Sequence, residues 1–172
     1  MKNGFTLIEL LIVTTLSIML MLTAAALFTT FLISNNRTDS SQLVKSNGEY
    51  ALGQMEFLLR NAIELLPNSQ AETCTAGMTE ITFRSVDDGT TTLFQEEDQN
   101  GIARIASNSG QFITSESVEL VSGLTFDCVE SPDKVQQYIT ISFTLQKAAT
   151  SFGNDEVDVQ QTFTTGVNIR TF

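Results

Sequence analysis

Histidine and tryptophan are absent from this chain, and basic side chains are scarce, with 9 Lys and Arg against 20 Asp and Glu. Without His, the sequence lacks the commonest general base and the commonest transition-metal ligand. The excess of negative charge argues against a basic face that binds nucleic acid. The lack of Trp weakens the case for a site that stacks carbohydrate on aromatic rings. We therefore expect neither an enzyme nor a nucleic-acid-binding protein.

Cysteine is also rare, with two residues, Cys74 and Cys128, in a chain of 172. Both lie in the part that we expect outside the cytoplasm, where an even count favours a disulfide. Their spacing is unlike a CxxC metal or redox motif. A bond between them would close a long loop and stabilise the fold by about 4 kcal/mol in the chain-entropy model. The alternative is two buried free thiols.

One long apolar run dominates the amino-terminal part of the chain, and Glu9 is the only ionisable side chain between residues 5 and 33. As a helix, residues 10–33 would measure about 36 Å, which spans a hydrocarbon core of roughly 30 Å. The run is longer than the apolar region of an ordinary secretory signal. Lys2 precedes it and only Arg37 soon follows, so the amino terminus is expected in the cytoplasm. We predict a single-pass membrane segment with the rest of the chain outside the cytoplasm.

Glu9 is the unusual residue of this run. A carboxylate at hydrocarbon depth costs about 2.5–3.5 kcal/mol on insertion scales, so it is treated as a functional residue by default. The alternative is that Glu9 reaches up to the lipid headgroups and pairs only with the amino terminus of its own chain.

The residues around Glu9 form a short motif. Residues 4–9 are Gly-Phe-Thr-Leu-Ile-Glu, and they follow a polar head with one Lys. With the long apolar helix behind it, this motif resembles the class III signal of type IV prepilins and type II secretion pseudopilins. The resemblance implies that a prepilin peptidase removes the leader, residues 1–4, by cutting between Gly4 and Phe5, and N-methylates Phe5. It also implies other pilin subunits and an inner-membrane assembly platform as partners. The expected location is the inner (cytoplasmic) membrane, then a pilus or pseudopilus.

The resemblance gives Glu9 a physical role in assembly. Methylation can leave the charge of the Phe5 amine in place, and Glu9 lies one helical turn further on. Two opposite unit charges about 4 Å apart attract by roughly 4 kcal/mol at an effective dielectric near 20. Glu9 of an incoming subunit would then pair with the Phe5 amine of a neighbour. Setting a register is the best-attested use of such buried charges.

Two features favour a minor subunit over a major one. Many major pilins carry Pro and Gly in the second half of the apolar segment, and here neither occurs between Phe5 and Gly48. Residues 50–62 are similar to the region just before the sheet in J-type minor pseudopilins. We expect a minor pilin. The alternatives are a J-type minor pseudopilin of a type II secretion system and a membrane-anchored binding module that does not polymerise.

After the membrane segment, 5–33, apolar residues recur at steps of three and four through residues 34–66, which predicts an amphipathic continuation of the same helix. Pro67 is expected to end this helix, because the residue before a proline is restricted to extended backbone. A free coiled coil is the alternative.

Residues 67–172 contain short runs of alternating apolar and polar residues between turn signals. Such alternation predicts an antiparallel sheet with one buried and one solvated face. The fold class that we expect is α+β, with a long helix packed on an antiparallel sheet. The predicted strands are 78–86, 90–94, 102–105, 111–113, 120–128, 138–145 and 157–171.

Acidic clusters occur in three loops of this domain. They could offer oxygen ligands to calcium, which needs six to eight of them, but none has a complete calcium-loop pattern. The plainer interpretation is a set of solvated loops, and we expect no cofactor. The clusters are Asp87-Asp88; Glu96, Glu97 and Asp98 with Asn100; and Asp155, Glu156 and Asp158.

Overall fold

The computed structural model describes residues 6–71, 73–86, 89–108, 110–133, 136–148 and 159–170. By its internal contacts the chain divides into two units, Met1–Asp39 and Ser40–Phe172, and each is described by itself. One helix and seven strands follow each other in the order α1 (Leu7–Arg60), β1 (Ala62–Leu66), β2 (Ile81–Ser85), β3 (Thr91–Gln99), β4 (Ile102–Ser107), β5 (Val118–Glu130), β6 (Gln136–Lys147) and β7 (Gln160–Arg170). The predicted α+β class is confirmed.

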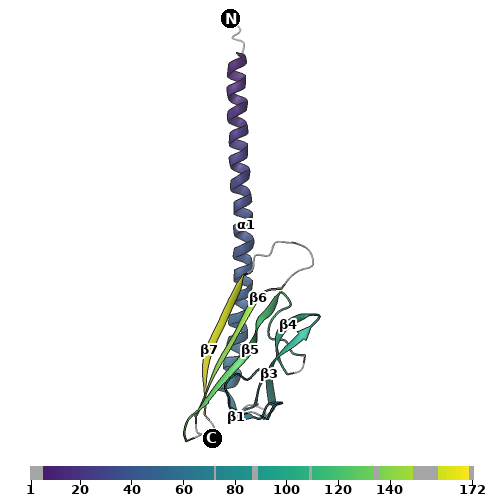
Figure 1. The fold of residues 1–172 in the computed structure, drawn as a ribbon, viewed down its shortest axis with the longest axis vertical. Helices are drawn as coiled ribbons and strands as arrows, with labels where there is room; N and C mark the ends of the chain where they lie inside the picture. Colours follow the sequence, from purple (N-terminus) through teal and green to yellow (C-terminus); the bar gives the residue numbers. More distant parts are fainter. Residues whose placement is uncertain are drawn as a thin grey trace. The chain divides into compact units, whose positions relative to one another are not determined.

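The strands form two antiparallel sheets, where the sequence predicted one (Figure 1). Strands β1 to β4 pair in sequence order, and β5, β6 and β7 pair in a second sheet. The β3–β4 hairpin turns at Asn100 and Gly101, which both have positive φ, as the Asn-Gly turn of a tight hairpin requires. The predicted strand at 111–113 is reduced to one isolated bridge, between Phe112 and Ala106.

The helix α1 ends earlier than predicted. The helix was expected to run to about Leu66, but it stops at Arg60, and residues 62–66 form β1. A register shift between Ala62 and Glu64 in the pairing with β2 leaves Ala62 and Leu65 as the buried side chains. A bulge adds one residue to a strand, so burial recurs after three residues, as it does on a helix. This spacing explains why the strand resembled a helical stripe.

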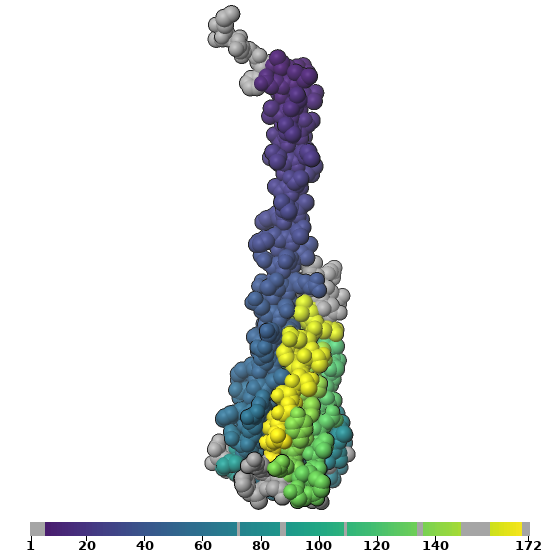
Figure 2. Space-filling model, turned by 90° about the vertical axis from the view of Figure 1, so that its left-hand side faces the viewer, coloured from purple at the N-terminus to yellow at the C-terminus, as the bar shows by residue number. Residues whose placement is uncertain are grey.

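The core lies between residues 40–60 of α1 and the two sheets. Val44, Ala51, Met55 and Leu59 are the apolar helix residues buried in it, and they recur at helical spacing. Figure 2 shows the atoms of β7 directly beside this part of α1. Gly48 permits the contact, because a Cβ at that position would collide with the ring of Phe163.

The sheet side of the core follows the predicted alternation. In β6, every second side chain from Gln137 to Leu145 is buried, while the residues between them are half-buried or exposed. The ring centroids of Phe143 and Phe163, on neighbouring strands, are 5.5 Å apart. Aromatic pairs at this distance add about 0.5–1.5 kcal/mol beyond the area that they bury.

Candidate functional site

The first turn of α1 is capped by Thr6. Its hydroxyl Oγ1 accepts a hydrogen bond from the N–H of Glu9 at 3.4 Å, and its carbonyl accepts from the N–H groups of Glu9 and Leu10 at 3.1 and 3.2 Å. A Thr followed three residues later by Glu is the sequence signature of a helix start. Residues 6–9 contain this signal, so the start of α1 at Leu7 could have been predicted from them.

Glu9 lies in this first turn, and its side chain is exposed. A carboxylate is favourable there, because the helix dipole leaves partial positive charge at the amino-terminal end. Within the described part of the chain, no basic side chain forms an ion pair with Glu9. Gly4 and Phe5, the predicted cleavage and methylation positions, lie outside the described residues, and so does the Phe5 amine.

A groove along one side of the same turns is lined by Thr6, Leu7, Leu10, Leu11 and Thr14. The last four positions are spaced as one helical face. At roughly 100° per residue, Glu9 lies on the other side of the helix. The start of α1 therefore presents an apolar face and, away from it, a single carboxylate.

The remainder of the apolar run is exposed in this unit, with large side chains such as Leu20 and Leu27 more than two-thirds accessible. By length and composition, α1 is the one helix in the described residues that could cross a membrane, although a signal sequence has the same properties. The chain thus carries an apolar segment suited to an anchor or a signal.

The threonine hydroxyls of this segment need no outside partner. Each donates to a carbonyl three or four residues earlier, as Thr15 does to Leu11 at 3.0 Å and Thr30 does to Ala26 at 2.9 Å. Polar groups in hydrocarbon must be satisfied internally. These bonds make the threonines compatible with lipid. The other hydroxyls bonded in this way are those of Thr14, Thr23 and Thr29.

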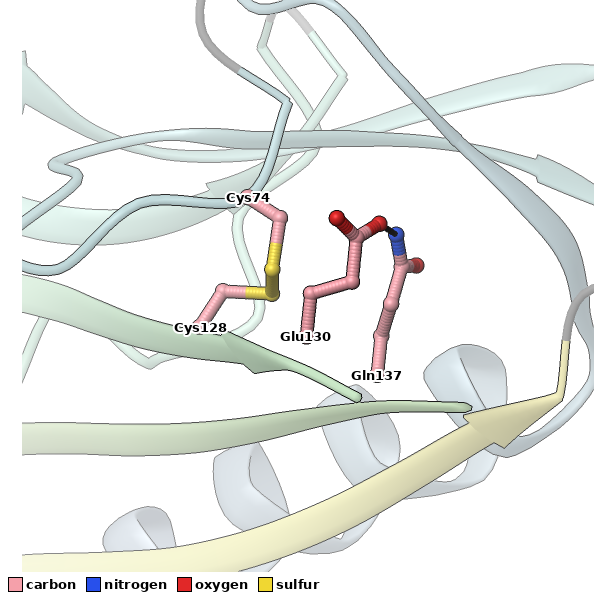
Figure 3. The surroundings of a disulfide bond; sticks show 4 residues. All are labelled: Cys74, Cys128, Glu130 and Gln137. Carbon is pink, nitrogen blue, oxygen red and sulfur yellow. Dashed lines mark hydrogen bonds between the residues drawn. A yellow bond between two sulfur atoms is a disulfide. The ribbon is translucent and has the colours of Figure 1, made fainter. Parts of the chain in front are cut away.

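The predicted disulfide is present: Cys74 and Cys128 are joined, with Cα atoms 5.0 Å apart. It fastens a short segment, residues 74–78, along β5 (Figure 3). Met78 and Phe126 exchange two backbone hydrogen bonds at 3.0 and 2.8 Å. The N–H of Cys128 donates to the carbonyl of Thr75 at 3.0 Å. The segment therefore covers part of an edge of β5 that would otherwise expose unpaired backbone groups.

Glu130 and Gln137 lie beside the disulfide, opposite each other on β5 and β6 (Figure 3). The Gln137 side chain is 5% exposed, and its Nε2 donates to Glu130 Oε1 at 3.0 Å. Its Oε1 has no hydrogen-bond partner among the described residues, and nothing in the surrounding side chains explains this.

The described acidic cluster holds turns together. Glu97 Oε2 accepts from the N–H of Gly110 at 3.0 Å, and Asp98 Oδ1 accepts from the N–H of Gly101 at 2.9 Å. Among the described residues, no three His, Cys, Asp or Glu side chains are placed to hold a metal ion. The clusters at Asp87-Asp88 and at Asp155, Glu156 and Asp158 lie outside the described residues.

Arg104 is a buried cation that the sequence analysis missed. It is 6% exposed, and its Nε donates to the carbonyl of Thr114 at 3.0 Å. Its guanidinium carbon lies 4.2 Å from the centre of the Phe112 ring. Burial lowers the pKa of Arg104 below its usual value, and the nearby carboxylate of Glu116 opposes this. Since Arg stays protonated in proteins, it acts as a fixed charge that holds the loop after β4.

Ser131 begins a Ser-x-x-Lys sequence, a spacing that some acyl-transfer enzymes use and that the sequence analysis did not recognise. Its hydroxyl contacts Asp133 and accepts from the N–H of Gln136 at 3.0 Å. Lys134 lies outside the described residues. The contacts of Ser131 are those of a turn between β5 and β6.

Comparison of this chain with protein-family models, with curated proteins and with solved structures found no match.

Proposed function

We propose that this chain is a structural subunit of a type IV pilus-like or pseudopilus filament, drawn from the inner membrane through its amino-terminal helix. The observation that carries the proposal is the single carboxylate of Glu9 in the first turn of a helix that is otherwise uncharged for more than twenty residues. The disulfide-closed domain after this helix supports export, because disulfides persist in oxidising compartments.

In this proposal a prepilin peptidase cuts between Gly4 and Phe5 and methylates the new amino terminus. The helix then carries a cation at its tip and a carboxylate in its first turn. Pairing Glu9 with the Phe5 amine of a neighbouring subunit removes an unpaired charge from lipid and sets one axial register. The partners are other subunits, the peptidase, the assembly platform and the bilayer.

The subunit is a minor pilin in this proposal. Support comes from the absence of Pro and Gly in the apolar run. A helix without these breakers has no ready point at which to unwind. A J-type minor pseudopilin is the nearest alternative, and the two share the same chemistry at Phe5 and Glu9.

The test is the substitution Glu9→Ala, followed by two separate measurements. Membrane insertion is measured by resistance to alkaline extraction, and incorporation is measured by the amount of the chain in sheared filaments. We expect normal insertion and loss of incorporation. Asp39→Ala is the matched control, because it removes an exposed carboxylate from the same helix outside the apolar run. Normal incorporation of Glu9→Ala would count against the proposed role of Glu9, and absence of the unaltered chain from the filaments would favour the membrane-anchored binding module that does not polymerise.

A further inference from the structure

The outer face of the β5–β6–β7 sheet carries two straight rows of hydroxyl groups. In each row, one side chain from each strand stands at the same level of the sheet. We name these the hydroxyl rows. The first consists of Thr125, Ser142 and Thr164, and the second consists of Ser122, Thr144 and Thr162.

The hydroxyl rows retain unused hydrogen-bonding capacity. Thr144 and Thr162 bond to each other at 2.9 Å, and Ser142 bonds to Thr164 at 3.2 Å. A hydroxyl has one donor and two lone pairs, so each bonded pair still offers an O–H and several lone pairs. On a sheet face, successive outward side chains are about 6.6–6.8 Å apart along a strand and 4.7–4.9 Å apart across strands. The rows follow this spacing on β6 and β7, while on β5 the register shifts between Ser122 and Thr125. The Thr125 hydroxyl donates to the carbonyl of Ser142 at 3.1 Å, so it offers lone pairs only.

An aromatic ring lies at one end of the hydroxyl rows. A Cβ on Gly166 would collide with the phenol of Tyr138, so the ring lies over β7 at the place where the glycine leaves room for it. Tyr138 is 46% exposed, and Val129, which stands opposite it on β5, is 65% exposed. Although the chain has no Trp, the ring of Tyr138 gives this face one flat, partly exposed aromatic surface.

The charge of the chain decides which kinds of partner this face can bind. The hydroxyl rows contain no charged residue, in a chain of net charge −11. Carboxylates lie beside them: Asp127 accepts from the N–H of Gly77 at 2.7 Å, Glu119 accepts from Gln146, and Glu96 Oε2 lies against Gly123 of β5. A strongly negative chain repels polyanions. An uncharged partner rich in hydroxyls fits the face best.

We propose that the outer face of β5, β6 and β7 binds an uncharged polysaccharide, whose hydroxyl groups bond to the hydroxyl rows while a sugar ring lies on Tyr138. A shallow sheet face suits an extended polymer, because it cannot enclose a small ligand as a pocket does. The inference goes beyond filament assembly and does not depend on it, since a single solubilised chain carries the whole face.

The test measures retention of the full chain on insoluble cellulose, chitin and starch, with alginate as the acidic comparator. The chain is kept in a detergent without a sugar headgroup, since an alkyl maltoside would compete. We expect retention on at least one neutral polymer and none on alginate. No retention on any neutral polymer, or equal retention on alginate, would overturn the proposal.

The variant Thr144→Val with Thr162→Val removes one bonded pair and keeps the branched shape of both side chains. Because a neutral hydrogen bond contributes about a factor of five and two hydroxyls are lost, we expect retention to fall by about five- to twenty-five-fold. The control is Thr79→Val with Thr91→Val, which changes two exposed threonines outside this sheet. Thermal unfolding checks that both variants fold. Unchanged retention of the first variant would refute the role of the rows.

Tyrosine fluorescence gives a second readout that loss of folding would not imitate. The chain has two tyrosines and no Trp, so Tyr50→Phe leaves Tyr138 as the single emitter. Soluble oligosaccharides of the retained polymer should change its emission in a saturable way. No change at saturating oligosaccharide would contradict contact with Tyr138. If sedimentation shows that the chain self-associates through this face and binds no glycan, a second copy is the occupant and the proposal fails.

Discussion

Residues 7–39 and residues 40–60 of α1 are both helical, yet all side chains of the first stretch are exposed, whereas the second buries Val44, Ala51, Met55 and Leu59. The first stretch is much the more apolar of the two. Exposure of so much apolar surface means that the partner of the first stretch is not part of its own unit. The second stretch has about as many polar as apolar residues, and the apolar ones on one face pack into a core with the sheets.

The two stretches also satisfy their polar groups differently. In the first, threonine hydroxyls bond back to their own helix, as Thr29 does to Ala26 at 2.9 Å. In the second, Ser46 Oγ and Asn47 Nδ2 also donate to their own helix, at the carbonyl of Leu43. Asn47 Oδ1, however, accepts from the N–H of Ser115 at 3.1 Å, which ties the helix to the loop after β4. A helix that meets lipid must satisfy its polar groups internally, while a helix that meets protein can also use them for tertiary contacts.

The largest expected effect comes from truncating one apolar side chain in each stretch. Met55→Ala should lower the free energy of unfolding of the domain by about 2–5 kcal/mol, because it leaves a cavity in a packed core. Leu20→Ala should leave it unchanged, since Leu20 is 70% exposed in the other unit. Denaturant unfolding of the full chain in detergent measures both. Equal losses would show that the first stretch also contributes to domain stability.

The second comparison introduces an arginine into each stretch of α1 and measures membrane insertion. Leu20→Arg should weaken membrane insertion by about 2.5–3.5 kcal/mol, the cost of Arg near the centre of a membrane helix. Gln42→Arg, at an exposed position of the second stretch, should insert normally. The measurement is the fraction of each variant that resists alkaline extraction. Normal insertion of Leu20→Arg would contradict a bilayer as the partner of the first stretch.

The smallest effect concerns two glycines of the second stretch. Gly48→Ala should cost about 1–3 kcal/mol, because the new Cβ overpacks the core against Phe163. Gly53→Ala should stabilise by up to about 1 kcal/mol, because its surroundings are open and Ala is the better helix former. Thermal unfolding of both variants gives the comparison. A stabilising Gly48→Ala would mean that the helix and β7 can separate at little cost.

The sequence predicted those parts of the fold in which one physical signal dominates. The alternation of β6 predicted a strand at 138–145, and the structure extends it to Gln136–Lys147. The even count of cysteines predicted the disulfide. The length of the apolar run predicted a helix that could cross a membrane. In each case no competing pattern occurs in the same residues.

Other features depend on contacts that no local pattern encodes. The bulge in β1 gave burial a helical spacing, so the end of α1 was placed too late. Arg104 lies in a strand whose second face is covered by the loop carrying Phe112 and Thr114, and this cover could not be foreseen. The hydroxyl rows could not be predicted for a different reason: their members come from three separate strands, and only strand pairing brings them together. The cap at Thr6, by contrast, had a local signal that was overlooked.

The segment that the disulfide fastens along β5 links the folding of this domain to its surroundings. While Cys74 is a free thiol, non-covalent contacts alone hold the segment in place: the backbone hydrogen bonds between Met78 and Phe126, the bond from the N–H of Gly77 to Asp127 and the buried side chain of Met78. An uncovered strand edge is a template for pairing with other chains. Closing the bond raises the cost of local opening at that edge. We therefore expect the oxidised chain to resist edge-to-edge aggregation better than the reduced chain.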